Sequence, residues 1–232
     1  MAGEILPGQL SEGLDTPAVG RYAIGYVELT GGQAADTDTV VIDGRTYEFD
    51  FAPVSITGDV GVDISGSGSS NDDVVAMETD ITADADATSV VDMGGNVAAI
   101  VANDPSTPGN VSLAVTGANP VRSAATLVGG EAKDLIPLER VRYVLTAADV
   151  TTLGAGSPQG DIPIGCIDLG IATANLGLYS LTIQTATGQF KTPATVRIRF
   201  ITVSGTKSLI VLGDAAVTLA ATDIIRMLIS AQ

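Results

Sequence analysis

The clearest alternation of hydrophobic and polar positions lies in residues 45–51. Aromatic residues occupy every second position from Tyr47 to Phe51, with polar residues between them, which is the period-two pattern of a strand with one buried and one solvated face. Residues 39–42 are a second run of strand formers. The intervening Asp43-Gly44 pair tolerates the positive φ angles that a type I′ turn requires at both central positions. These residues predict a β-hairpin.

A single helix is predicted at residues 71–84. Ser70 or Asn71 can cap its N-terminus, two acidic residues occupy the first turn, where the helix dipole favours anions, and three apolar residues share one face. These residues are Asp72 and Asp73, then Val74, Met77 and Ile81. Strand-forming runs flank the helix at residues 23–30, 60–64, 88–91, 96–101 and 110–115. The helix is therefore expected to pack on a sheet.

The pattern of the second half predicts almost pure β structure. Strand candidates lie at residues 179–185, 196–203, 208–212, 215–219 and 224–229. A short helical turn is predicted at residues 147–152, because Thr146 and Asp149 have the spacing of a capping box with Asp in place of Glu. The fold class predicted from these patterns is mainly β, with two small β-rich domains that are β-sandwich or barrel-like.

Composition divides the chain into three parts. Residues 1–20 show neither the helical nor the strand period of apolar residues, and they contain prolines and several glycines. They are therefore expected to form an extended N-terminal arm that orders only against a partner. Residues 21–132 are expected to form an acidic β-rich domain with one helix on its sheet. Residues 133–232 are expected to form a near-neutral β domain, with the boundary at residues 129–134.

The formal charge differs strongly between the two expected domains. Residues 1–132 hold 20 acidic and three basic residues, a charge of −17, whereas residues 133–232 hold seven acidic and eight basic residues, a charge of +1; together they give the −16 of the chain. A surface this negative repels a phosphate backbone, so nucleic acid is not an expected partner. Solubility alone is the other explanation for the acidic half.

Several functional classes are disfavoured by what the sequence lacks. No apolar run reaches the ~18 residues of a membrane span, and the N-terminus has no basic region before an apolar run, unlike a secretory signal. The chain has no His, which removes the usual general base, and no Gly-x-Ser-x-Gly motif. Its single cysteine, Cys166, is expected to be a small buried hydrophobe. We therefore expect no enzyme.

Two segments imitate ligand-binding motifs. Gly66 and Gly68 lie between a predicted strand and the helix, as in a dinucleotide-binding loop, but Asn71 replaces the third glycine and aspartates occupy the helix N-terminus that a pyrophosphate would need. Several acids could supply oxygen ligands to Ca²⁺, yet their spacing lacks the glycine and distal Glu of a calcium loop. These acids are Asp80, Asp84 and Asp86, with Asp36 and Asp38 elsewhere. We expect no cofactor, metal or catalytic site.

The run from Leu29 to Phe49 resembles a module of tailed-bacteriophage virion proteins. That module has the pattern tGxPadGDtvtIgGktYtF, followed by an Asn- or Asp-opened helix and a closing Gly-Gly pair, and the same order occurs here through residue 130. Residues 141–167 are similar to TltaaD…vtlgtlPaG segments of phage head and decoration proteins, although Ile-Pro-Ile-Gly at 162–165 stands where the family more often has Leu-Pro-Ala-Gly. Together the resemblances cover about residues 22–232.

The resemblance implies a non-enzymatic structural virion protein, and more specifically a capsid decoration (cement) protein that binds and stabilises the phage head. It implies assembly in the host cytoplasm, a place on the outer surface of the head, and the major capsid protein as partner. A homotrimer is expected, with a dimer as the second choice, since decoration proteins generally sit on local symmetry axes and exposed strand edges can pair between copies. The alternatives are a head-fibre or tail structural protein and, from a different class, a carbohydrate-binding β module, which the low aromatic content of 4% disfavours.

Arg197 and Arg199 are the candidate capsid-interface residues. Both fall on one face of the strand predicted at residues 196–203, while the apolar residues take the other face. An acidic shell would attract the near-neutral half through these arginines more readily than the acidic half. The alternative is that they are the solvated face of an outer strand, because charged residues on an edge strand also prevent aggregation.

Overall fold

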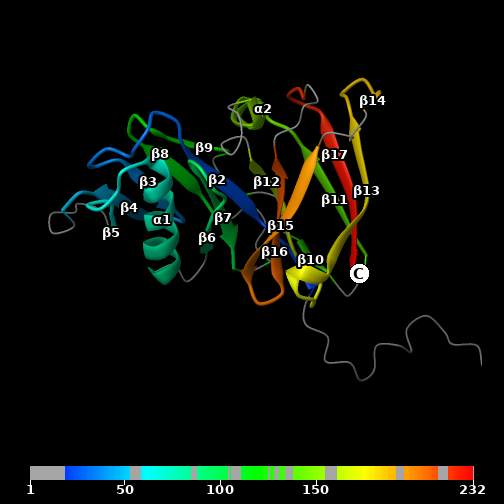
Figure 1. Ribbon diagram of the computed structural model, residues 1–232, viewed down its shortest axis with the longest axis horizontal. Coiled ribbons are helices and arrows are strands. Elements are labelled where there is room, and N and C mark those ends of the chain that lie inside the picture. The colour runs from blue at the N-terminus through cyan, green and yellow to red at the C-terminus, as the bar shows by residue number, and fades with distance from the viewer. Residues whose placement is uncertain are drawn as a thin grey trace, which may run out of the picture.

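The computed structural model describes most of the chain and confirms a mainly β fold. The described residues are 19–52, 59–84, 88–103, 105, 111–124, 126–127, 131–133, 138–154, 161–191, 196–213 and 219–231. Within them the strands form four sheets, accompanied by the helices α1 (Ser70–Asp84) and α2 (Ala147–Gly154) and the 3-10 helix η1 (Thr173–Asn175) (Figure 1).

The first half of the chain supplies two four-stranded sheets. The first sheet has the order β5-β4-β3-β8 and the second sheet the order β6-β7-β2-β9. Their pairings are antiparallel except that β4 and β5 run parallel. The strands are β2 (Ile24–Leu29), β3 (Thr39–Ile42), β4 (Arg45–Asp50), β5 (Val60–Asp63), β6 (Thr88–Asp92), β7 (Val97–Ala102), β8 (Leu113–Thr116) and β9 (Pro120–Arg122).

The second half supplies most of two further antiparallel sheets. The third sheet has the order β10-β1-β12-β16-β15 and the fourth sheet the order β11-β17-β13-β14. The strands are β1 (Val19–Tyr22), β10 (Glu131–Lys133), β11 (Leu138–Val144), β12 (Ile162–Asp168), β13 (Leu176–Gln184), β14 (Phe190–Lys191), β15 (Arg197–Ser204), β16 (Lys207–Gly213) and β17 (Ile224–Ala231).

The sheets are stacked from first to fourth, and α1 packs against β5 of the first sheet and β6 and β7 of the second sheet (Figure 1). One hydrophobic cluster joins the first sheet, the second sheet and α1, and the other joins the second, third and fourth sheets. Neighbouring residues of β7 serve different clusters, because Ile100 belongs to one and Val101 to the other. The second sheet is thus buried on both faces, and the two halves of the chain share a continuous interior.

The predicted hairpin and helix are confirmed. Ile42 lies opposite Arg45, so β3 and β4 are joined by a two-residue turn. Asp43 has φ 51° and Gly44 has φ 81°, the positive values at both central positions that a type I′ turn requires. Helix α1 buries the three apolar residues expected on its inner face, Val74, Met77 and Ile81.

The expectation of a single solvated face along residues 45–51 is wrong. Glu48 is only 3% exposed and Asp50 only 6% exposed, whereas Phe51 is 46% exposed. Phe51 follows the last residue of β4 and therefore no longer obeys the alternation of the strand. The Asp50 carboxylate is used locally, since its Oδ1 accepts the backbone N–H of Ala52 at 2.6 Å.

The sheets do not follow the domain boundaries drawn from the sequence. Strand β1 belongs to the third sheet, where Tyr22 lies opposite Cys166 of β12, and β10 falls within the expected boundary segment and pairs with β1. Sequence patterns also missed β9 and β11 as strands. The rest of the predicted arm, residues 1–18, lies outside the described residues, as do Asp86 and residues 215–218 of one predicted strand.

Candidate functional site

Arg197 and Arg199 do share one face of a strand, but that face turns toward the second sheet. Strand β15 is an edge strand of the third sheet, and Arg199 Nη2 donates to the carbonyl oxygen of Met93, in the connection between β6 and β7. The Nη2 atom of Arg197 lies 2.9 Å from Asp161 Oδ1, and the Nη2 atom of Arg199 lies 2.6 Å from Asp161 Oδ2. One carboxylate therefore bridges both arginines.

The bridging carboxylate is buried, with 4% of the Asp161 side chain exposed, whereas the Arg197 and Arg199 side chains are 51% and 37% exposed. The chain leaves room for this ion cluster at Gly213, where an added Cβ would lie 2.6 Å from Asp161 Oδ1 and 2.7 Å from Arg197 Nε. A buried carboxylate that lost its cations would be strongly destabilising. These arginines hold the fold together, and their role at an interface stays a prediction.

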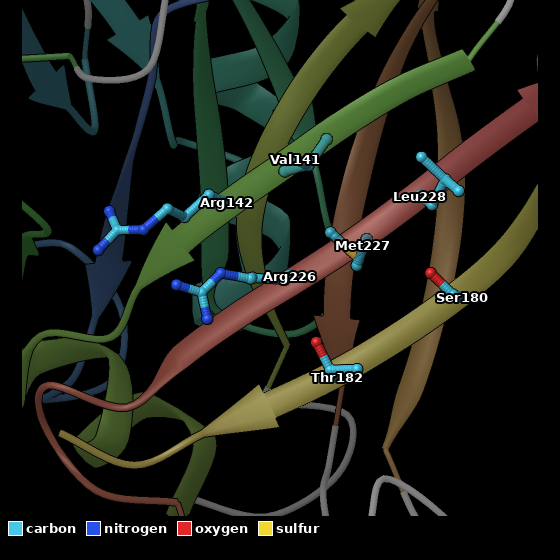
Figure 2. A pocket seen from close by; sticks show the side chains of 7 residues that line it. All are labelled: Val141, Arg142, Ser180, Thr182, Arg226, Met227 and Leu228. Carbon is cyan, nitrogen blue, oxygen red and sulfur yellow. The ribbon is translucent and has the colours of Figure 1, made fainter. Parts of the chain in front are cut away.

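A second pair of arginines lies on the outer face of the fourth sheet. Arg142 of β11 and Arg226 of β17 are directly opposite each other in the antiparallel register, and Thr182 of β13 follows in the same row. Figure 2 shows the two arginine side chains extending in the same direction from neighbouring strands. Arg226 Nη1 donates to Gln184 Oε1, and within the described part of the chain no carboxylate pairs with either guanidinium.

This outer face is hollowed between its strands. A cavity of about 390 Å³ is lined by Val141, Arg142, Ser180, Thr182, Arg226, Met227 and Leu228 (Figure 2). Four large hydrophobic side chains of the same sheet are exposed: Val144 and Leu178 at 38%, Phe190 at 72% and Tyr179 at 75%. Among the described side chains of this face there is no carboxylate. The surface is therefore basic and partly apolar, on a chain whose net charge is −16.

The composition of this surface is suited to binding another protein. Arginine and aromatic side chains are enriched at interfaces and among the residues that dominate binding energy, and a polar rim surrounds them. Two guanidinium groups side by side can take a carboxylate through charge-assisted hydrogen bonds. Like charges directly opposite each other in a sheet are destabilising, so Arg142 and Arg226 do not improve the stability of the isolated chain by facing each other.

A buried polar network joins the second sheet to α2 and β11. Tyr26 donates its hydroxyl to Asp149 Oδ1 at 3.0 Å, Tyr143 donates to Asp149 Oδ2 at 3.1 Å, and Thr152 donates to Glu28 Oε2 at 2.7 Å. Asp149 is fully buried and Glu28 is 6% exposed. Burial, together with the Asp149 charge, raises the pKa of both Tyr26 and Tyr143 well above the usual tyrosine range.

The sequence predicted only one part of this network. The expected capping box at α2 is confirmed, because Asp149 Oδ2 accepts the backbone N–H of Thr146 at 2.7 Å while the Asp149 N–H donates to Thr146 Oγ1 at 3.1 Å. The bonds from Tyr26 and Glu28 link residues more than a hundred positions away, which no local pattern indicates. The network fastens the two halves of the chain rather than lining an open site.

The acids of the first half bind their own backbone and neighbours. Asp80 Oδ2 accepts the N–H of Asp63 at 3.0 Å, and Asp84 forms an ion pair with Arg45 at 2.5 Å. At the start of α1, Asp72 accepts the N–H of Gly68 at 3.0 Å, a bond that lowers the pKa of this carboxylate. Within the described residues, no group of three potential metal ligands gathers.

Cys166 is buried in the third sheet, as expected. Desolvation raises the pKa of its thiol to about 12, so the thiol stays protonated near neutral pH. The Lys207 ammonium group lies 4.2 Å from the centroid of the Tyr22 ring and donates to the carbonyl oxygen of Ala102 at 3.2 Å. Burial lowers the pKa of Lys207. These residues are parts of the core between the second and third sheets.

Comparison with known proteins identifies no family for this chain. In the part of the chain that the structure describes, no helix is both long enough and apolar enough to cross a membrane. The chain was compared with protein-family models, with curated proteins and with solved structures, and none of them matches it.

Proposed function

We propose that the chain is a non-enzymatic structural virion protein, a capsid decoration (cement) protein that binds the assembled phage head through the outer face of the fourth sheet. The observation that carries the proposal is the Arg142–Arg226 pair, placed side by side without a carboxylate partner among the described residues beside exposed apolar side chains. A surface of this kind gains most when a partner supplies carboxylates and covers the apolar groups.

The distribution of charge gives the attachment a direction. Exposed carboxylates gather on the first sheet and α1, at the opposite end of the stack from the fourth sheet (Figure 1). They include Asp36, Asp43, Asp59, Asp63 and Asp72. An acidic shell repels that end and attracts the arginine-bearing sheet. The fourth sheet is thus the attached end, and the acidic first half is displayed outward.

The carbohydrate-binding alternative receives a specific test from the exposed aromatic residues. Tyr179 and Phe190 are both exposed, and stacking on one sugar requires rings close together. Phe190 lies opposite Gln184, five residues along β13 from Tyr179, which corresponds to about 16 Å at the usual strand rise. That spacing does not form a single stacking platform, so the arginine pair favours a protein partner.

A sedimentation assay tests the proposal. Purified protein is mixed with undecorated heads and, separately, with isolated tails, and each mixture is centrifuged. We expect saturable co-sedimentation with heads, weakened by added salt because exposed charges are screened. Co-sedimentation with tails alone would support the alternative of a tail component, and binding to neither particle would contradict the proposal.

A further inference from the structure

Among the described strands, none pairs with the second edge of β11, and a groove borders this edge. In the fourth sheet β11 pairs only with β17 among the described strands. Two hollows lie along its other side, and both are lined by consecutive residues of β11: Arg142, Tyr143 and Val144 for one, and Val141, Arg142 and Tyr143 for the other. The other lining residues come from β1, β2, β12 and the segments after β9 and β11, and none of these pairs with β11, so the hollows separate β11 from the second and third sheets.

The larger hollow has the volume and the walls to receive side chains. It holds about 340 Å³ and is bordered by Ile24, Gly25 and Tyr26 of β2, by Ser123 and Ala124 after β9, and by Pro163 of β12. The smaller hollow, of about 40 Å³, continues along the edge and includes Ile164 and Cys166. The floor of the groove is therefore formed by the second and third sheets, with β11 as its outer wall.

The two sides of this edge differ in chemistry. The side that faces the groove presents mainly apolar groups, such as Ile24, Pro163 and the Tyr143 ring. The side that faces outward presents Arg142 with Arg226 beside it (Figure 2). A strand paired with β11 would direct alternate side chains to these two sides. Its preferred sequence therefore alternates between apolar and acidic residues.

We propose that the free edge of β11 accepts an extended segment of a partner polypeptide, in which apolar side chains enter the groove and the intervening Asp or Glu side chains bind Arg142 and Arg226. Strand addition of this kind takes affinity from backbone hydrogen bonds and specificity from alternate side chains. The identification of that partner as the shell protein rests on the proposed function, but strand addition at β11 does not.

The alternative role of Arg142 is to block the edge against aggregation. Free edges are commonly protected by charged residues, bulges or covering loops. A charge alone would account for Arg142, but it does not account for an open apolar groove immediately beside the strand. The apolar groove is an observation that edge protection does not explain, and it favours binding of a partner strand at this edge.

A peptide with the required alternation tests strand addition directly. The probe is fluorescein-labelled Val-Asp-Val-Glu-Val-Asp-Val, and its control carries Lys at each acidic position. We expect the acidic peptide to bind in an anisotropy titration and to slow hydrogen exchange of the amides at residues 138–144. Equal binding of the Lys peptide, or binding without protection of these amides, would overturn the proposal.

Two substitutions test separately how much the groove and the Arg142 charge contribute to peptide binding. Ala124→Trp fills the groove without altering β11 and should abolish binding, whereas the matched Ala114→Trp on exposed β8 should leave it unchanged. Arg142→Ser should weaken binding about tenfold, the loss of roughly one charge-assisted hydrogen bond. Far-ultraviolet circular dichroism confirms that each variant is folded. Binding of the Ala124→Trp variant at wild-type strength would overturn the proposal.

The peptide experiment and the head-binding assay can fail independently of each other. If the acidic peptide protects β11 but the protein does not bind heads, strand addition stands and the proposed function fails. If heads bind but no peptide protects β11, the proposed function stands and strand addition fails. A peptide of residues 1–18 is tested in parallel, and protection by that peptide alone would overturn the assignment to a different polypeptide, because the occupant would then be a segment of this chain.

Discussion

Two pairs of arginines in the second half of the chain have opposite roles. Arg197 and Arg199, two positions apart on one strand, converge on the buried carboxylate of Asp161. Arg142 and Arg226, on neighbouring strands, face each other on an exposed surface without a carboxylate among the described residues. The first pair neutralises a buried carboxylate, whereas the second pair has a hydrogen bond from Arg226 to Gln184 but no carboxylate partner among the described residues. Only the second pair is available to a partner at no cost to the fold.

The largest expected effect concerns the internal pair. Asp161→Ala leaves Arg197 and Arg199 without their shared carboxylate. We expect the free energy of unfolding to fall by about 3 kcal/mol. This value is at the lower end of the range for a broken buried ion pair, because both arginines are partly exposed. Urea denaturation measures the change. Asp36→Ala, at an exposed carboxylate with one 3.3 Å bond to the Phe51 N–H, is the control and should cost about 0.5 kcal/mol or less.

Both arginine pairs illustrate what sequence patterns can and cannot supply. Period-two alternation placed Arg197 and Arg199 on one face of a strand, but it could not identify Asp161 as their partner because that contact depends on how the start of β12 lies relative to β15. The pair Arg142 and Arg226 is formed by register between strands far apart in sequence. No local pattern reveals such a neighbour.

Among the helices and strands, too, those that depend on local interactions were predictable and those that depend on long-range pairing were not. The Asp43-Gly44 hairpin and helix α1 were predictable, since turn chemistry and helix capping act over a few residues. Strands β1 and β10 were not, because they are short and are held by pairing across the chain. Composition suggested separate domains, whereas the second sheet contributes side chains to both hydrophobic clusters.

The next largest effect is expected at alkaline pH. The raised pKa values of Tyr26 and Tyr143 mean that the native state keeps these protons above pH 10, while the unfolded chain releases them near its pKa of about 10. The unfolded state then binds fewer protons, so stability falls as pH rises above about 10, by up to roughly 1.4 kcal/mol per pH unit for each tyrosine.

Urea denaturation between pH 8 and pH 11 measures this slope. Tyr26→Phe with Tyr143→Phe should make the decline with pH shallower, although the double variant is less stable at neutral pH because Asp149 loses two donors. Tyr179→Phe, at a ring that is 75% exposed, provides the control and should follow the wild-type slope. An unchanged slope in the double variant would show that these tyrosines do not hold their protons in the folded protein.

The smallest effect on stability is expected at the outer pair. Arg142→Ser with Arg226→Ser removes two like charges that face each other, and the free energy of unfolding should change by no more than about 0.5 kcal/mol. Thermal and urea denaturation provide the measurement. A loss as large as that of Asp161→Ala would mean that the outer pair is also structural, and the distinction between the two pairs would disappear.

Binding to undecorated heads by variants of the two pairs tests the central claim most directly. Arg142→Ser with Arg226→Ser should abolish saturable co-sedimentation at low salt, whereas Arg197→Lys with Arg199→Lys, which keeps both charges beside Asp161, should bind normally. Arg45→Ser with Arg122→Ser removes the same charge from the first half and should also bind normally. Saturation of heads by the Arg142→Ser and Arg226→Ser variant at wild-type concentrations would contradict attachment through the fourth sheet.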